Sequence, residues 1–164
     1  MIIALTGYMG AGKSTVGSIV ADALGCPFID LDDVVVKAAG KGIPDIFAQD
    51  GEQGFRALEA DCLKKTLKEY GGSTAVLALG GGTVTCPGVP KLLQEKTLCI
   101  WLKASLDTLT ERVKGGSERP LADDGFTARY AFREPLYAAA AHITLETDGL
   151  TSEEIADEII IDCL

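Results

Sequence analysis

Hydrophobic residues along the chain fall into short apolar runs that alternate with amphipathic and polar stretches. Five runs are typical of buried or half-buried strands, because they are short, rich in aliphatic residues and followed by turn residues. They cover residues 1–6, 28–29, 74–79, 97–102 and 142–147. Helices are predicted between them, at residues 15–24, 43–50, 52–70, 87–94, 106–113 and 126–141, with two more beginning near residue 33 and at the Thr151–Glu154 capping box.

This alternation predicts a single α/β domain over residues 1–164, with a five-stranded parallel sheet flanked by helices on both faces. Gly51 is expected to end one short helix before the longer one begins. The polar stretch from Lys114 to Gly125 has no core periodicity, and a loop of that length is usually functional or disordered. A functional loop of this kind would be a closing lid, and Arg119 is the candidate for the positive charge that it would carry.

The first apolar run leads directly into Gly7-x-x-x-x-Gly12-Lys13-Ser14, which has Walker A spacing. Glycines let successive backbone N–H groups converge on phosphate oxygens, and the helix that follows presents its positive end to the same anion. Lys13 adds a charge near the β- and γ-phosphates, and the Ser14 hydroxyl can ligate Mg²⁺. A chance match in a glycine-rich chain is the alternative, but the strand before the motif and the helix after it favour a phosphate-binding loop.

Composition narrows the class of protein. The net charge is −9, but residues 134–164 hold eight acids and no lysine or arginine, so the remainder is nearly neutral. Without a basic stripe we expect no nucleic acid partner, and without a long apolar segment or a signal peptide we expect no membrane association and a cytoplasmic location. No exposed apolar stripe indicates an oligomer, so a monomer is expected. The five cysteines are scattered and are expected to be reduced, mostly buried thiols.

Residues at strand ends are candidates for chemistry, because open parallel sheets bind ligands at the carboxyl ends of their strands. Asp30 and Asp32 follow the second strand and can serve a metal and substrate hydroxyls, or an aspartate here can simply cap the next helix. Gly80, Gly81 and Gly82 follow the third strand; they either let backbone amides approach a ligand or form a flexible turn.

Two further positions have simple structural interpretations. Arg56 and Glu59 are three residues apart and share a helix face, which favours an exposed ion pair. His142 is the only histidine, and it is expected to be a strand residue with a satisfied ring rather than a catalyst.

Six segments, in order along nearly the whole chain, resemble the shikimate kinase family. Residues 7–15 are similar to its phosphate loop, 28–32 to its Asp-x-Asp motif, 46–59 to its Phe-Arg-x-x-Glu region, 79–82 to its triple glycine, 119–121 to its lid motif and 133–137 to the segment of its final substrate arginine. The first motif alone indicates only an NTPase, whereas the six together are specific.

The resemblance implies a P-loop kinase fold with a helical substrate-binding subdomain at about residues 31–60 and a mobile lid at about residues 112–125. It implies ATP-dependent phosphorylation of the 3-hydroxyl of shikimate, giving shikimate 3-phosphate and ADP for aromatic amino acid biosynthesis.

It also implies roles on the nucleotide side. Lys13 and Arg119 would neutralise charge on the transferring phosphoryl group, and Asp32 would orient or deprotonate the 3-hydroxyl. Mg²⁺ would be held by Ser14 and, through water, by Asp30. The residues expected to contact ATP are Gly10, Ala11, Gly12, Lys13, Ser14, Thr15, Arg112 and Arg119, with Arg112 against the adenine.

On the acceptor side, Arg56 and Arg133 would bind the shikimate carboxylate, since guanidinium forks match its geometry. Glu59 would hold these arginines in place. The groups expected to contact the ring and its hydroxyls are Asp32, the backbone of Gly80, Gly81 and Gly82, and the walls formed by Phe47, Phe55, Pro120 and Leu121.

One departure and two rival functions bear on this interpretation. Family members often carry an arginine near the adenine after the fifth strand, but residues 147–151 contain no basic residue, so backbone contacts would have to replace it. Gluconate kinase and the nucleoside monophosphate kinases share the P-loop and lid, although the triple glycine with Arg133 favours shikimate. A non-catalytic nucleotide-binding regulatory module is the alternative of another class; it would be expected to lack one of Lys13, Asp30, Asp32 or Arg119, and all are present.

Overall fold

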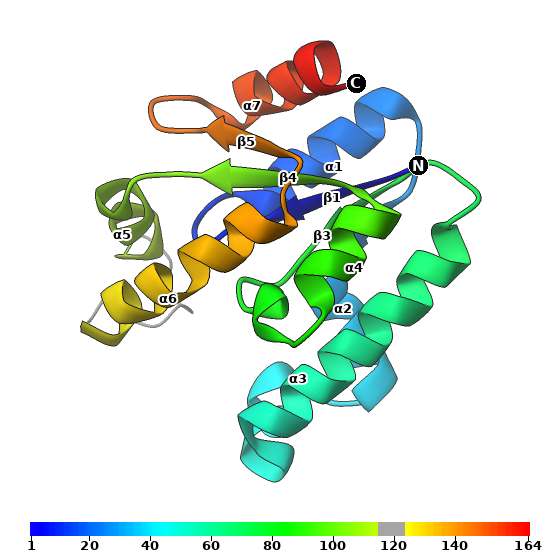
Figure 1. Cartoon of the computed structure of the whole chain (residues 1–164), viewed down its shortest axis with the longest axis vertical. Coiled ribbons are helices and arrows are strands. Elements are labelled where there is room, and N and C mark those ends of the chain that lie inside the picture. The colour runs from blue at the N-terminus through cyan, green and yellow to red at the C-terminus, as the bar shows by residue number, and fades with distance from the viewer. Residues whose placement is uncertain (115–123) are drawn as a thin grey trace.

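The computed structural model describes residues 1–114 and 124–164 of the chain (Figure 1). Arg119, Pro120 and Leu121, with most of the expected lid, lie outside the described residues. The elements, in chain order, are β1 (Ile2–Thr6), α1 (Lys13–Leu24), β2 (Phe28–Asp30), α2 (Leu31–Ala39), α3 (Ile43–Tyr70), β3 (Ala75–Ala78), the 3₁₀ turn η1 (Thr83–Thr85), α4 (Val89–Lys96), β4 (Leu98–Lys103), α5 (Leu106–Lys114), α6 (Asp124–Ala140), β5 (Ile143–Glu146), α7 (Ser152–Glu158) and the π-helical η2 (Ile159–Cys163).

The five strands form one parallel sheet in the order β2-β3-β1-β4-β5. The central strand β1 pairs with β3 on one side, with Ile3 opposite Val76, and with β4 on the other, with Leu5 opposite Ile100. Every residue of β1 and β3 is buried, as expected for strands covered on both faces. Helix α1 packs against α7, and α4 packs against α6. In Figure 1, α1 lies behind β1 and β4, α7 lies above β5, and α4 and α6 lie in front of the sheet. The predicted fold class is confirmed.

Several predicted helix boundaries follow from single residues. Gly51 has φ 71° and interrupts α3, so the short helix and the long one are separated where the sequence predicts. The Thr151–Glu154 capping box is also confirmed: Thr151 Oγ1 accepts from the Glu154 amide at 3.1 Å, and the Glu154 carboxylate accepts from the Thr151 amide at 3.0 Å. Gly25 ends α1 in the left-handed conformation.

Other boundaries differ from the prediction. The helix α1 begins at Lys13, two residues before the predicted start, because Gly12 takes a positive φ that turns the chain directly into the helix. The helix α2 begins at Leu31 rather than near residue 33, because Asp30 is its cap. The turn η1 was not predicted, and it delays the next helix to Val89.

The cysteines are free thiols, and the histidine ring is hydrogen-bonded. All five cysteines are free thiols and three are buried, as predicted. Burial raises the pKa of the Cys99 thiol to about 12. The His142 ring, just before β5, accepts from the Cys99 amide through Nδ1 at 3.0 Å and lies 3.0 Å from the Gln94 carbonyl through Nε2, so its ring is satisfied. Within residues 1–114 and 124–164, no helix is long and apolar enough to cross a membrane.

Candidate active site

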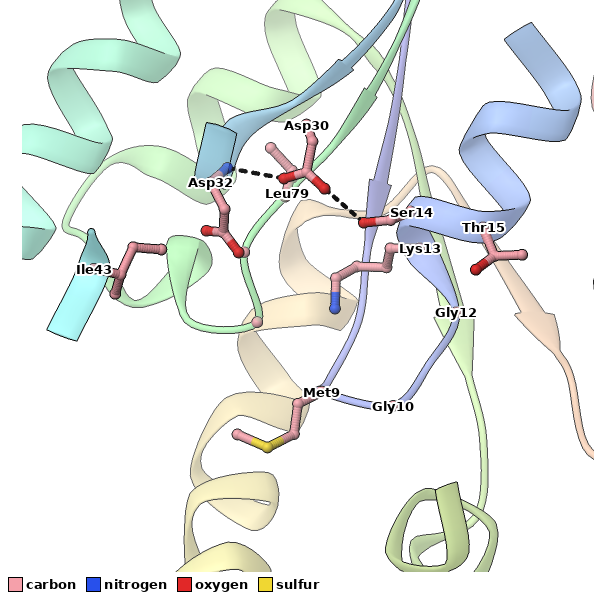
Figure 2. Close-up of a pocket in the computed structure, with 12 residues that line it drawn as sticks. Met9, Gly10, Gly12, Lys13, Ser14, Thr15, Asp30, Asp32, Ile43 and Leu79 are labelled. Atoms are coloured by element: carbon pink, nitrogen blue, oxygen red, sulfur yellow. Dashed lines mark hydrogen bonds between the residues drawn. The ribbon is translucent and has the colours of Figure 1, made fainter. Parts of the chain in front are cut away.

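A pocket of about 500 Å³ lies where β1, β2 and β3 end, at the carboxyl edge of the sheet (Figure 2). Parallel strands place their carboxyl ends on one edge, so the residues that follow them meet there although they are far apart in sequence. The lining residues are Met9, Gly10, Gly12, Lys13, Ser14, Thr15, Asp30, Asp32, Ile43, Leu79, Gly80 and Gly81.

The loop between β1 and α1 has the backbone that a phosphate cradle needs. Gly7, Gly10 and Gly12 have φ values of 149°, 86° and 89°, which disfavour any residue with a Cβ. A Cβ on Gly7 would also lie 2.7 Å from the Leu102 carbonyl oxygen in β4. The Lys13 ammonium donates to the carbonyls of Gly7 at 2.7 Å and Tyr8 at 3.0 Å, which holds it over the loop.

Asp30, the first of the two aspartates at the end of β2, makes two separate contacts. Asp30 Oδ1 accepts from the Asp32 amide at 2.9 Å, so Asp30 is a helix cap. Its other oxygen accepts from the Ser14 hydroxyl at 2.7 Å, which brings a carboxylate and a hydroxyl together at the start of α1 (Figure 2). The capping interpretation is therefore confirmed for Asp30, and its role at a metal stays a prediction.

The Asp32 carboxylate and the Lys13 ammonium both extend into the pocket (Figure 2). Burial is the main reason why the pKa of Asp32 is raised above its ordinary value, and the neighbouring carboxylates of Asp30 and Glu59 raise it further. The Lys13 charge opposes this shift. The result is a carboxyl group whose proton affinity exceeds that of a surface aspartate, at the mouth of a phosphate-binding loop.

The glycine run after β3 lies close to side chains from three elements. A Cβ on Gly80 would lie 2.7 Å from Glu59 Oε2, and one on Gly82 would overlap the Arg56 guanidinium. The carbonyls of Gly81 and Gly82 accept from Tyr137 Oη at 2.5 Å and Thr85 Oγ1 at 2.6 Å. These hydrogen bonds attach the run to its neighbours, and at Gly80 and Gly82 the absence of a Cβ leaves room for the Glu59 and Arg56 side chains. The approach of its backbone amides to a ligand stays a prediction.

The Arg56–Glu59 pair is not exposed, so that interpretation is also wrong. Glu59 is fully buried, and its two oxygens accept from Arg56 Nη1 at 2.6 Å and from Thr83 Oγ1 at 3.0 Å. Only 17% of the Arg56 side chain is exposed. Helix α3 turns this face toward the glycine run, which the helical spacing alone does not reveal.

Arg133 reaches the same glycine run from α6. Its Nη1 lies 3.8 Å from the position that a Cβ on Gly81 would occupy, and the residue is 8% exposed. Two guanidinium groups from distant helices thus border neighbouring glycines. Phe47 and Phe55 lie on the Arg56 side, with ring centroids 4.8 Å apart, and the Phe55 ring is 5.0 Å from Arg56 Cζ.

A second cavity, of about 280 Å³, lies on the other side of the phosphate loop. Arg112 of α5 lies beside it and donates to the Gly10 carbonyl at 3.0 Å. The residues that line it are Ala11, Gly12, Val16, Arg112, Leu150, Thr151, Ser152 and Ile155. The loop after β5 therefore borders this cavity, and it offers hydroxyl and backbone groups rather than a cation.

Sequence reasoning missed two tyrosines at the site. Tyr8 occupies a variable position of the Walker A pattern, so no motif marks it. Its buried hydroxyl donates to the Phe126 carbonyl at 2.6 Å. Tyr137 lies four residues after Arg133, on the same face of α6, and this spacing was the one signal available.

Comparisons with known proteins agree with this geometry. The family model for shikimate kinase matches residues 9–164. The shikimate kinase of Geobacter sulfurreducens is 41% identical over 162 residues, covering 96% of this chain and 87% of that protein. The shikimate kinase of Limosilactobacillus fermentum is also 41% identical, over 98% of this chain and 94% of that protein.

Solved structures agree as well. The structure of shikimate kinase from Acinetobacter baumannii in complex with shikimate has a TM-score of 0.86 and 32% identity, covering 97% of this chain and 90% of that one. The shikimate kinase of Aquifex aeolicus also has a TM-score of 0.86 and 32% identity, over 98% and 95% of the two chains. The chain belongs to the shikimate kinase family.

Proposed function

We propose that this protein transfers the γ-phosphoryl group of ATP to the 3-hydroxyl of shikimate, giving shikimate 3-phosphate and ADP. The observation that carries the proposal is the shared pocket, in which the phosphate loop with Lys13 faces Asp32 and borders the glycine run. Under this proposal a donor site and an acceptor site would meet at one edge of the sheet.

On the donor side, the backbone amides of the loop and the N-terminus of α1 would hold the triphosphate, since both present unpaired N–H groups to an anion. Lys13 would leave the carbonyls of Gly7 and Tyr8 for phosphate oxygens, which carry full charge and are stronger acceptors. The adenine would occupy the cavity beside Arg112, with the loop after β5 as its other wall.

Ser14 and Asp30 have the chemistry of a magnesium site. Mg²⁺ prefers oxygen ligands and usually combines one or two carboxylates with substrate phosphates and water. Ser14 and Asp30, which are hydrogen-bonded to each other at 2.7 Å, would be the protein's share of these ligands. When bound, Mg²⁺ would neutralise charge on the β- and γ-phosphates.

On the acceptor side, Arg56 and Arg133 would bind the shikimate carboxylate from two directions, next to the glycine run. Glu59 holds Arg56 in place before substrate arrives, which reduces the ordering that binding requires. The ring would lie against Phe47 and Phe55, with the backbone of Gly80 to Gly82 near its substituents. Residues 31–60 would act as the substrate-binding subdomain, and Pro120 and Leu121, outside the described residues, would complete the wall.

With both substrates bound, the 3-hydroxyl oxygen would attack the γ-phosphorus while the bond to the β–γ bridging oxygen breaks. Such transition states are loose, so positioning and charge stabilisation contribute more than a strong base. Asp32 would orient the hydroxyl and accept its proton as the new ester bond forms; the burial that raises its pKa favours this proton transfer. Lys13 would stabilise the developing charge, together with Arg119, which lies outside the described residues.

A substrate panel tests the proposal. The purified protein is incubated with MgATP and shikimate, quinate, gluconate or a nucleoside monophosphate, and ADP is followed in a coupled assay. We expect turnover with shikimate to exceed that with the other acceptors by at least an order of magnitude in kcat/KM, since buried polar groups left unpaired penalise the wrong substrate. Equal or better turnover with another acceptor would refute the assignment. Size-exclusion chromatography of the same sample tests the predicted monomer.

A further inference from the structure

We propose that Tyr8 and Tyr137 are positioning residues for acceptor binding, because they hold Arg133 and helix α6 in register with the phosphate loop and the glycine run. This inference rests on the proposed function, in which Arg133 binds the acceptor carboxylate. It gives a role to two side chains that the proposed function does not use.

Tyr8 connects the phosphate loop to α6. Its carbonyl accepts from Lys13 Nζ at 3.0 Å, while the residue is only 1% exposed. The hydroxyl donates to the carbonyl of Phe126, in the first turns of α6, at 2.6 Å. One residue therefore contacts the phosphate-binding lysine through its backbone and the acceptor-binding helix through its side chain.

The Tyr8 ring also lies beside the acceptor arginine. Arg133 Cζ is 5.7 Å from the Tyr8 ring centroid, within the range in which an aromatic face attracts a cation. Arg133 is almost buried, so its charge has lost most of its hydration. The ring compensates part of that loss and gives the guanidinium a surface against which to lie.

Tyr137 connects the same helix to the glycine run. Its ring is fully buried against Trp101, with centroids 5.7 Å apart, and its hydroxyl donates to the Gly81 carbonyl at 2.5 Å. Burial raises the pKa of Tyr137 above its usual range, and the neighbouring Arg133 opposes that shift. The phenol thus remains a protonated donor, one helical turn from Arg133 and adjacent to it.

These contacts have a common effect on geometry. The Arg133 guanidinium lies near the Tyr8 ring and near the Tyr137 side chain, and the two hydroxyls attach α6 to separate loops of the site. Because a displacement of about 1 Å at a reacting centre can cost 10²-fold in rate, such attachments matter even though neither tyrosine touches the transferring group. Loss of one should weaken acceptor binding more than nucleotide binding.

Single substitutions separate ring from hydroxyl. Tyr8→Leu removes the ring beside Arg133, Tyr8→Phe restores it without the hydroxyl, and Tyr137→Phe removes only the bond to Gly81. Steady-state kinetics with the acceptor that the panel identifies should give a KM for acceptor about 5- to 10-fold higher in Tyr8→Leu and Tyr137→Phe. The rise should be smaller, about 3-fold, in Tyr8→Phe, which loses the bond to Phe126 but keeps the ring beside Arg133. The KM for ATP should change less than about 2-fold in all three.

Tyr130→Phe is the matched control. Tyr130 lies on the same helix, and its ring contacts Tyr8 with centroids 5.4 Å apart, but its hydroxyl faces the Ala104 carbonyl at 3.4 Å rather than either loop. We expect its acceptor KM to equal that of the wild type. Thermal unfolding of every variant shows whether a kinetic change follows from a general loss of stability.

A double-mutant cycle decides the mechanism. If Tyr137 acts through Arg133, then Tyr137→Phe should lower kcat/KM far less in an Arg133→Ala background than in the wild type. Independent, multiplying effects would overturn the inference, as would an equal rise in the KM for ATP or a lower Tm with unchanged acceptor KM. Failure of the proposed function looks different, because then wild type does not turn over shikimate or Arg133→Ala leaves the acceptor KM unchanged.

Discussion

The two halves of the site are built in different ways. The phosphate half is one continuous segment, Gly7 to Ser14, in which three glycines set the backbone and one lysine adds charge. The proposed acceptor half would be assembled from the end of β2, a face of α3, the glycine run after β3 and a face of α6. Eight consecutive residues can form a phosphate site because its ligands are mostly backbone amides. Recognition of a carboxylate requires side chains that converge from several elements.

The two halves also differ in how deeply their polar and charged side chains are buried. Lys13 is half-buried and Ser14 is exposed, whereas Glu59 is fully buried and Arg133 nearly so. Charged groups in the acceptor half have therefore lost hydration and depend on their partners. Substitutions in the phosphate half should affect chemistry with little effect on stability, and those in the acceptor half should affect binding, folding or both.

The largest expected effect is that of Lys13→Met, which removes the charge at the phosphate half and keeps the side-chain volume. Loss of one preorganised charge at the transferring group should lower kcat on the order of 10³-fold. Stability should change little, because the side chain is partly exposed. Coupled ADP assays and thermal melts check both parts. Unchanged kcat would contradict the role given to the phosphate loop, and Lys13→Arg tests whether charge alone suffices.

Arg133→Ala should act on the acceptor half alone. Removing one partner of a nearly desolvated charge contact should cost about 2–5 kcal/mol in shikimate binding, or roughly a 30-fold or greater increase in KM for shikimate. The KM for ATP should remain close to the wild-type value. Arg133→Lys retains the charge without the planar fork, so its KM for shikimate is expected to lie between those of the wild type and Arg133→Ala. A change in the KM for ATP alone would show that Arg133 does not belong to the acceptor half.

Glu59→Ala tests whether burial makes the acceptor half a structural element. Breaking this pair leaves Arg56 without its closest acceptor and Thr83 without a partner for its hydroxyl. The free energy of unfolding should fall by about 3 kcal/mol in urea titrations. Asp61→Ala, which breaks the exposed Asp61–Lys65 pair at 2.9 Å on the same helix, should cost less than about 1 kcal/mol. Equal losses of unfolding free energy in the two variants would refute the distinction between the buried pair and the exposed pair.

Asp32→Asn should separate stability from activity. Because the folded state raises the pKa of Asp32, it binds the proton more tightly than the unfolded chain, so stability falls as pH rises from the ordinary aspartate pKa through the raised one. Removing the ionisable group should therefore raise Tm near pH 7, while kcat falls on the order of 10²-fold.

Asp33→Asn is its control, since it removes an exposed carboxylate from the same helical turn. The difference in Tm between the two variants should shrink as the pH is lowered through the raised pKa of Asp32 toward the ordinary aspartate value of about 4, because both the folded protein and the unfolded chain then become protonated at this position. A Tm difference that is independent of pH, or lower stability of Asp32→Asn at neutral pH, would contradict the assigned cause of the pKa shift.

Much of this protein is determined by local sequence. The Walker A glycines, the break at Gly51 and the capping box at Thr151 each act within a few residues, and each has the predicted form in the structure. The alternation of apolar runs with helical segments is likewise sufficient to predict a parallel α/β sheet. These features depend on backbone conformation and hydrophobic periodicity, which neighbouring residues encode directly.

Only the tertiary structure decided which side chains meet. Spacing along α3 suggested that Arg56 and Glu59 form an exposed pair, and burial against the glycine run reversed that interpretation. The contacts of Tyr8 with Phe126 and of Tyr137 with Gly81 join segments 118 and 56 residues apart, and no local pattern marks them. The order of strands in the sheet brings these segments to one edge. Their charges and hydroxyls acquire partners there because desolvation makes unpaired polar groups costly, and that cost exists only once the chain is folded.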